Sequence, residues 1–459
     1  MKNRNLCTWV LCLLTLAALP SCEKEFLELK PDKTLVVPTT LEDLQALLDH
    51  GAVMNTGTSH ALAEFGSDDY YVSTATWQLL PRPEEKNGYI WAKEVYEGQP
   101  VNDWDYAYRR ILYANTVLEG LEKLQPSPAQ QAAWSQAKGM ALFHRGWAFF
   151  QLAQLFAKPY DAATAAQDPG IPLRLSADVG AVPTRQSVAE TYRQILEDLQ
   201  AAEALLPEHA IVPQRPGKAA ARQVLARTYL QLGDYQQALT STEGALQLSS
   251  TLLDYNTLDT SAAFPFPTQG VGNPEIVFYS NQYALEILFA GRVQVDSVLY
   301  QSYDTLDLRR QAFFYYEGDK LTFKGSYEGF YSLSTALTTG ELYLTKAECL
   351  ARLGQPEEAL HTLNQLLARR YEAGAFEPLT TDNTPDVLGR ILEERRKELL
   401  FRGVRWQDLR RLNKDPRFAK TLVRHIDGKR YELPPNDPRY VWPIPDNVVQ
   451  ASGLPQNPR

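Results

Sequence analysis

The spacing of apolar and small residues repeats in two stretches of the chain. ARTYLQLGDYQQAL covers residues 226–239, and AECLARLGQPEEAL covers residues 347–360. The positions that recur in step are Ala226, Leu232, Gly233, Ala238 and Leu239, followed by Ala347, Leu353, Gly354, Ala359 and Leu360. Small residues let two antiparallel helices approach closely, and glycine allows the turn between them. The repeated spacing therefore predicts two helical hairpins.

Each predicted hairpin resembles the tetratricopeptide helix-turn-helix unit, which buries its apolar face only when neighbouring hairpins stack on it. Helical periodicity elsewhere supplies such neighbours, over residues 40–49, 103–124, 129–156, 187–206 and 386–413. The fold class that we predict is mainly α, built from tetratricopeptide-like helical hairpins. The alternative is that the two repeated hairpins are unrelated amphipathic pairs.

The helical period fails in two segments that are rich in aromatic residues. Residues 59–100 mix aromatic side chains with Asp, Asn, Gly and Pro, which is a composition typical of a binding loop. Residues 254–338 predict an irregular, loop-rich insert with a few short strands. The aromatic residues of the insert include Tyr279, Tyr283, Tyr303, Phe330 and Tyr331. The insert separates an N-terminal helical region, residues 40–253, from a C-terminal region, residues 339–459.

The first residues of the chain have the pattern of an export signal. Lys2 and Arg4 precede an apolar run over residues 6–19, which is too short to span a bilayer. The run ends in LPSC, and this order resembles a bacterial lipobox whose cysteine is Cys22. We predict a lipoprotein signal peptide over residues 1–21, lipidation of Cys22 and an extended tether over residues 22–39. The alternative is an ordinary signal peptide that contains a cysteine.

Composition adds limits on partners and on redox chemistry. The chain has 459 residues, 44% of them apolar and 22% charged, with a formal net charge of −9. This acidic balance argues against nucleic acid as a partner. Beyond the predicted signal peptide only Cys22 and Cys349 remain, so no disulfide framework is expected. Cys349 lies within a predicted helix and is expected to be a buried small apolar residue.

The motifs of common catalytic and metal sites are absent from the sequence. The six histidines form no HExxH pattern, and the chain contains no CxxC, no GxSxG and no phosphate-binding loop. Glu394 and Glu398 lie four residues apart among arginines, and we interpret them as part of a structural ion-pair network rather than as catalytic acids. We therefore predict no catalytic residues, no metal site and no cofactor, and we favour binding over turnover.

Aromatic residues of the 59–100 segment are the candidate ligand contacts. A flat ring can cover the apolar C–H face of a sugar while neighbouring polar side chains bond its hydroxyl groups. The candidates are the rings Tyr70, Tyr71, Trp77 and Trp91, with Asp68, Asp69 and Asn87 as polar partners. Core packing and contact with a partner protein are the alternatives for each ring. If the rings bind ligand, changing Trp77 and Trp91 to alanine should weaken binding and leave thermal stability nearly unchanged. Trp104, Trp134, Trp147 and Trp406 lie in predicted helices and are expected in the core.

Several motifs of the chain are distinctive when taken together. The most distinctive is ERRKELLFRGVRWQDLRR over residues 394–411. The chain also ends in YVWPIP at 440–445 and QNP at 456–458, and it contains ALFHRGWAFFQL at 141–152 and GIPL at 170–173. With the Cys22 signal, these motifs resemble the SusD/RagB family of nutrient-binding outer-membrane lipoproteins of the Bacteroidetes. The resemblance covers nearly the whole chain after the predicted signal peptide.

The resemblance implies a scaffold of tetratricopeptide-like hairpins with a less regular segment that forms the ligand face. It also implies a cell-surface protein, anchored in the outer membrane through its lipid, that delivers an oligosaccharide to a SusC-like TonB-dependent transporter. A peptide ligand, as in some members of the family, is one alternative. A tetratricopeptide scaffold that binds only proteins and a glycosidase are the others.

Overall fold

The computed structural model describes residues 38–57, 61–283, 285–289 and 291–459. The predicted signal peptide, Cys22 and most of the predicted tether lie outside these residues. The chain divides into two compact units, residues 1–39 and residues 40–459. All elements described below belong to the second unit.

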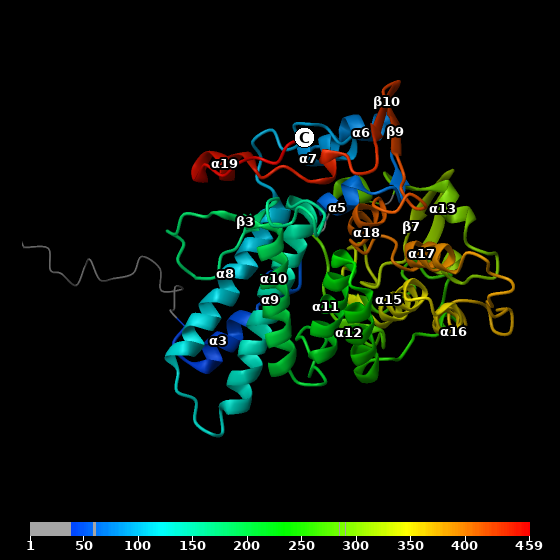
Figure 1. Ribbon diagram of the computed structural model, residues 1–459. Coiled ribbons are helices and arrows are strands. Elements are labelled where there is room, and N and C mark those ends of the chain that lie inside the picture. Colours follow the sequence, from blue (N-terminus) through cyan, green and yellow to red (C-terminus); the bar gives the residue numbers. More distant parts are fainter. Residues whose placement is uncertain (1–37, 58–60, 284, 290) are drawn as a thin grey trace, which may run out of the picture. The chain divides into compact units, whose positions relative to one another are not determined.

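Long helices form the frame of this unit. They are α3 (Leu41–Leu48), α8 (Asn102–Lys123), α9 (Gln131–Phe156), α10 (Val188–Leu205), α11 (Lys218–Leu232), α12 (Tyr235–Leu248), α15 (Thr339–Arg352), α16 (Pro356–Leu367), α17 (Val387–Glu398) and α18 (Arg405–Leu412). From α8 to α12 each helix packs on the next, α12 then packs on α15, and α15 packs on both α16 and α17. Figure 1 shows this succession as a series of neighbouring helices that runs from cyan through green to yellow. The mainly α fold is confirmed.

The two repeated stretches form the hairpins α11–α12 and α15–α16. Gly233 and Gly354 lie between the paired helices and have φ angles of 76° and 78°, in the left-handed region where glycine is favoured. The four repeated alanines are buried in the helix interfaces, at Ala226, Ala238, Ala347 and Ala359. Small residues thus let the helices pack closely, as the sequence predicts. Cys349 is buried in α15, which confirms its predicted place.

The strands are short and pair in antiparallel twos. They are β1 (Tyr70–Tyr71) with β5 (Gln294–Val295), β2 (Pro169–Pro172) with β3 (Arg185–Ser187), β4 (Ile276–Phe278) with β8 (Leu337–Thr338), β6 (Phe314–Glu317) with β7 (Lys320–Phe323), and β9 (Leu422–Ile426) with β10 (Lys429–Leu433). The β6–β7 hairpin pairs Phe314 with Phe323 and Tyr315 with Thr322. The insert contains short strands, short helices α13 (Ser297–Gln301) and α14 (Arg309–Phe313) and connecting loops, in agreement with the prediction.

The 59–100 segment differs from the irregular loop that the sequence predicts. It contains the short helices α5 (Ala61–Gly66), α6 (Thr74–Leu79) and α7 (Pro83–Tyr89), following α4 (Gly51–Met54). Residues at their first turns favour the helices α6 and α7, which have no long apolar stripe. The Ser73 side chain caps α6, and Pro83 begins α7 with a φ angle that suits a first helical residue. Six or seven residues are too few to display a helical period.

The predicted helix over 386–413 is interrupted in its middle. The α17 helix ends at Glu398 and α18 begins at Arg405. Between them Phe401 and Gly403 have φ angles of 55° and 71°. A positive φ is rare for a phenylalanine and stops helix propagation, so the strained backbone separates the two helices. The chain after α18 forms the β9–β10 hairpin and the helix α19 (Asp446–Ser452).

A buried ion-pair network joins α17 to the insert. Arg309 of α14 bonds Glu394 at 2.6 Å and Glu398 at 3.2 Å, and Asp307 completes its set of carboxylates at 2.7 Å. Arg370, which follows α16, bonds Glu398 at 2.8 Å and Glu275 of the insert at 2.7 Å. The predicted structural role of Glu394 and Glu398 is confirmed. Glu394 also pairs with Arg390 and Lys397 of α17, whereas Arg309 and Arg370 come from distant segments of the chain.

Neighbouring positive charges favour the ionised forms of Glu394 and Glu398 although both side chains are buried. Burial alone would raise the pKa of Glu394, but the nearby charges of Arg309, Lys397 and Arg390 hold that pKa at about 2. The pKa of Glu398 is also lowered, because Arg370 and Arg309 outweigh its burial. Removing one charge from such a set leaves its partners uncompensated in a medium of low polarity. The network therefore fixes the register between α17 and the insert.

Changing Glu398→Gln is expected to lower the free energy of unfolding by about 3–5 kcal/mol, because Arg370 and Arg309 lose a buried partner. Urea unfolding followed by circular dichroism measures the change. The matched control is Glu393→Gln on the same helix, where the carboxylate is 41% exposed and pairs only at 3.5 and 3.6 Å. That control should cost about 0–1 kcal/mol. Equal losses in the two variants would contradict a role for the buried network.

Candidate ligand-binding site

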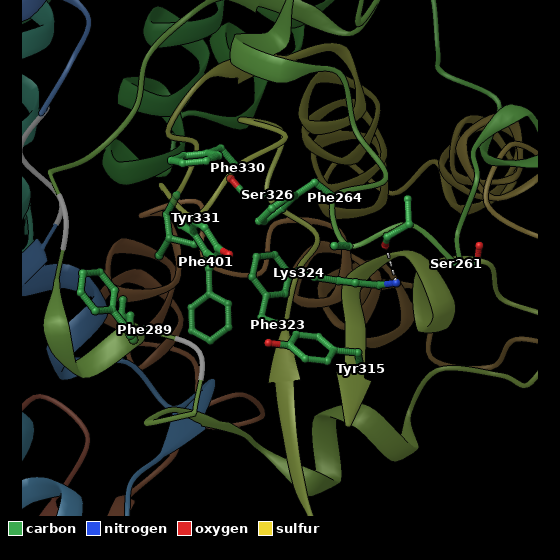
Figure 2. Close-up of a pocket in the computed structure, with 14 residues that line it drawn as sticks. Ser261, Phe264, Phe289, Tyr315, Phe323, Lys324, Ser326, Phe330, Tyr331 and Phe401 are labelled. Carbon is green, nitrogen blue, oxygen red and sulfur yellow. Dashed lines mark hydrogen bonds between the residues drawn. The ribbon is translucent and has the colours of Figure 1, made fainter. Parts of the chain in front are cut away.

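The insert encloses an aromatic cleft with a volume of about 640 Å³. Its lining consists of Ser261, Ala262, Ala263, Phe264, Leu288, Phe289, Tyr315, Phe323, Lys324, Ser326, Phe330, Tyr331, Leu333 and Phe401. Figure 2 shows the labelled rings gathered around one space from different segments of the chain. We call this set of residues the aromatic cleft. Its volume lies within the range of small-molecule binding sites.

The mouth of the cleft presents rings to solvent. Phe330 is 55% exposed, Tyr331 is 67% exposed and Phe289 is 41% exposed. Phe330 and Tyr331 contact one another edge to face with centroids 4.9 Å apart, and Phe264 packs against both. Exposed apolar rings held by other rings are preorganised for contact with a flat apolar surface. The mouth is therefore suited to stacking.

The C-terminal region contributes the floor of the cleft. Phe401 follows α17, is buried, and has the positive φ angle described above. Its ring lies 5.0 Å from that of Phe323 in β7 and 6.1 Å from that of Tyr70 in β1, measured between centroids. A strained conformation that the surrounding packing maintains is a frequent feature of functional sites. Phe401 thus connects the cleft to the ion-pair network through α17.

Lys324 is the one charged side chain among the described residues that line the cleft. Its ammonium donates hydrogen bonds to the carbonyl oxygens of Thr260 at 2.7 Å and Ala262 at 3.0 Å. Partial burial lowers the pKa of this lysine, and the nearby Asp259 carboxylate opposes the shift. The cleft therefore has an apolar interior with a positive group at one end.

Asp68 and Asp69 are engaged by the C-terminal region. The Asp68 carboxylate pairs with Arg405 at 2.6 Å and with Lys420 at 2.7 Å, and the Asp69 carboxylate pairs with Arg396 at 2.8 Å. Burial would raise the pKa of Asp68, but Arg405 and Arg396 hold it well below its ordinary value. These carboxylates attach the 59–100 segment to α17 and α18. They are not among the residues that line the aromatic cleft.

Two of the candidate rings lie in the core. Trp91 is 1% exposed, and its indole N–H donates to the carbonyl oxygen of Gly66 at 3.1 Å. Tyr70 is 4% exposed. The Arg424 guanidinium lies 4.8 Å from the Trp91 ring and 5.3 Å from the Tyr70 ring. Cation–π contacts of this kind stabilise a buried arginine, so the structure gives both rings a packing role.

The other three candidates of this segment lie nearer the surface. Tyr71 is 46% exposed, and its hydroxyl donates to Gln294 at 3.1 Å. Trp77 of α6 is half-buried and donates its indole N–H to the carbonyl oxygen of Lys86 at 2.9 Å. Asn87 of α7 donates to Glu97 at 2.9 Å and to the Val95 carbonyl oxygen at 3.3 Å. The aromatic cleft contains none of the three.

The sequence does indicate the cleft, although none of the predicted ligand contacts belongs to its lining. The density of aromatic residues in the insert, including Phe330 and Tyr331, is visible without a structure. Phe401 is different, because it lies within a predicted helix and a single sequence does not show that the helix breaks there. The predicted core positions Trp104, Trp147 and Trp406 are buried as expected, and Trp134 is half-buried against the core.

The described residues contain no group of three or more His, Cys, Asp or Glu side chains that could hold a metal ion. None of their helices is both long and apolar enough to cross a bilayer.

Two family models match most of the chain. Residues 25–230 match a SusD-like model, which describes starch-binding proteins that associate with the outer membrane. Residues 334–459 match the SusD family model. The chain belongs to the SusD/RagB family. It is therefore a SusD-type surface binding protein, and proteins of the SusD family are associated with the outer membrane.

Individual SusD-like proteins share the fold at low identity. A SusD superfamily protein of Bacteroides thetaiotaomicron is 20% identical with a TM-score of 0.72, covering 92% of this chain and 100% of the other. A SusD-like carbohydrate-binding protein of Bacteroides vulgatus is 20% identical with a TM-score of 0.68, covering 91% and 97%. A SusD-like protein of Formosa agariphila is 37% identical over 109 residues, which are 23% of this chain and only 20% of that protein.

Changing Trp91→Ala is expected to lower the free energy of unfolding by about 3–5 kcal/mol, because a fully buried indole is removed and a cavity remains. For Trp91, this expected loss replaces the prediction from the sequence that thermal stability would stay nearly unchanged. The control is Trp77→Ala, whose half-buried ring should cost clearly less. Thermal and urea unfolding measure the difference. Similar stability of the two variants would show that Trp91 does not support the core.

Proposed function

We propose that this protein is a cell-surface nutrient-binding lipoprotein that holds an oligosaccharide in the aromatic cleft and delivers it to a SusC-like TonB-dependent transporter. The observation that carries the proposal is the cleft itself, because aromatic rings, three of them exposed, line a space of about 640 Å³. Membership of the SusD/RagB family supports it. So does the carbohydrate binding named for the similar Bacteroides vulgatus protein.

Stacking is the physical basis of the proposed recognition. Phe330 and Tyr331 present ring faces or edges at the mouth of the cleft, where a sugar can place its apolar C–H face and keep most hydroxyl groups in water. Binding of this kind changes no covalent bond, and it agrees with the absence of common catalytic motifs from the sequence. Tyr71, Trp77 and Asn87 remain proposed secondary contacts outside the cleft.

The proposed position at the membrane comes from the N-terminal sequence. The LPSC motif supports acylation of Cys22, and the acidic residues that follow support an extended tether. The transporter as partner is carried over from the family. The tetratricopeptide-like frame also fits a scaffold that binds only proteins, and such a scaffold would have no need of the aromatic cleft.

The paired change Phe330→Ala and Tyr331→Ala is expected to weaken binding of the recognised oligosaccharide by about tenfold or more, because two stacking surfaces are lost. Stability should change little, since both rings are exposed. Calorimetry against a panel of plant, algal and host oligosaccharides measures binding. The control is Tyr316→Ala, which removes a ring of β6 that is 61% exposed and lies outside the cleft. Unchanged affinity in the paired variant would move the ligand site elsewhere.

Changing Cys22→Ser is expected to release the protein from the membrane fraction, because the thioether-linked lipid can no longer form. Metabolic labelling with an alkyne analogue of palmitate should mark the native protein and not the variant. The matched control is Cys349→Ser, which changes the buried cysteine of α15 and should leave labelling intact. Labelling of the Cys22 variant would contradict lipidation at this residue.

A further inference from the structure

The aromatic cleft has little capacity to bond hydroxyl groups in its interior. Ser261 donates its hydroxyl to Asp259 at 2.6 Å, and Ser326 donates its hydroxyl to the Ser332 carbonyl oxygen at 2.6 Å. The Ser326 oxygen also accepts from two backbone N–H groups. No carboxylate or amide side chain occurs among the described residues that line the cleft. Apart from Lys324, only the hydroxyls of Tyr315 and Tyr331 remain as polar side-chain partners.

This lining is poorly matched to an unmodified sugar that is fully enclosed. A buried hydroxyl group without a hydrogen-bond partner costs about 1–3 kcal/mol, and one sugar unit carries several. Phe264, Phe323 and Phe401 face the interior instead and match an apolar, ring-sized group. The mouth, with its exposed rings, can still cover one face of a sugar whose hydroxyls stay in water. The cleft thus has two parts with different chemistry.

We infer that the cleft selects a glycan that carries an aromatic acyl ester, with the aromatic group inside the cleft and its sugar stacked at the mouth. This inference rests on the proposed function and adds the chemical class of the ligand. Phe264, Phe323 and Phe401 contact the aryl group, and Phe330 and Tyr331 contact the sugar.

Lys324 provides a partner for the ester carbonyl. Two of its three N–H groups are bonded to the carbonyl oxygens of Thr260 and Ala262. The third has no hydrogen-bond partner among the residues that the structure describes, and the side chain lines the cleft. An ester carbonyl oxygen accepts a hydrogen bond and, having no O–H of its own, requires no acceptor in return. The Lys324 ammonium is therefore a better partner for an ester carbonyl than for a hydroxyl or N–H group, which must also donate a hydrogen bond.

A peptide with an aromatic side chain is the competing ligand. Its ring would fit the interior equally well. Each residue, however, also brings a backbone N–H and C=O that need partners when they leave water. The described lining offers no carboxylate or amide side chain to accept from those N–H groups. The observations therefore favour an esterified glycan over a peptide.

The test compares three probes by calorimetry on the full mature chain. The probes are methyl 6-O-benzoyl-β-D-glucoside, methyl β-D-glucoside and N-acetyl-L-phenylalanine amide. The benzoyl ester is expected to bind about tenfold or more tightly than the parent glucoside, because only the ester fills the apolar interior. Phe264→Ala should reduce this preference, because one of the rings that contact the aryl group is lost from the lining, and it should change stability little, because the Phe264 side chain is only half-buried. Tyr316→Ala should retain it.

Each other outcome has a definite meaning. Equal affinity for the ester and the parent glucoside overturns the inference and leaves the proposed function standing. Tighter binding of the phenylalanine amide than of the ester overturns the glycan assignment in favour of a peptide ligand. Binding of none of the three probes also overturns the inference, while the oligosaccharide panel decides the proposed function separately. Loss of unfolding cooperativity in Phe264→Ala directs the comparison to Phe264→Leu, which keeps apolar volume but removes the ring.

Discussion

The buried pairing of Arg309 and Arg370 with Glu394, Glu398 and Glu275 holds the functional part of this structure together. Two of these residues belong to the insert, one follows α16, and two lie on α17. Each charge is fully or almost fully removed from water, so it can persist only while its partners stay in place. The network is therefore compatible with only one position of the insert relative to the helical frame. An apolar contact of similar area would tolerate more sliding, because hydrophobic packing is not directional.

That restraint explains how a ring in the C-terminal motif becomes the floor of a cleft in the insert. Glu398, a member of the network, is the last residue of α17, and Phe401 follows three residues later with a positive φ angle. Arg396 and Arg405 hold the chain on both sides of this break through Asp69 and Asp68. The strained backbone is thus fixed before and after the ring. Asp68 and Asp69, which the sequence predicts as ligand contacts, lie outside the lining of the aromatic cleft and hold the chain around Phe401 in place.

The helical frame was predictable because its signals are local and repeated. Gly233 and Gly354 mark the two turns, and the buried alanines mark the interfaces, at a spacing that a single sequence displays. The short helices α6 and α7 escaped prediction because six or seven residues are too few for a period. The cleft was only partly predictable. Density of aromatic residues indicates where rings gather, yet Trp91 and Phe330 look alike in sequence, and only tertiary packing makes one buried and the other exposed.

The same contrast explains why the frame and the insert carry different tasks. In the frame, backbone polar groups are paired within regular helices, and small buried residues close the interfaces between these helices. Four phenylalanines and two tyrosines of the insert line an open space together with Phe401, and the serines of this lining are already hydrogen-bonded to neighbouring residues. A surface of that kind gains free energy by covering rings rather than by bonding hydroxyls. We therefore propose that the shape and apolarity of the group that enters the cleft decide which ligand this protein binds.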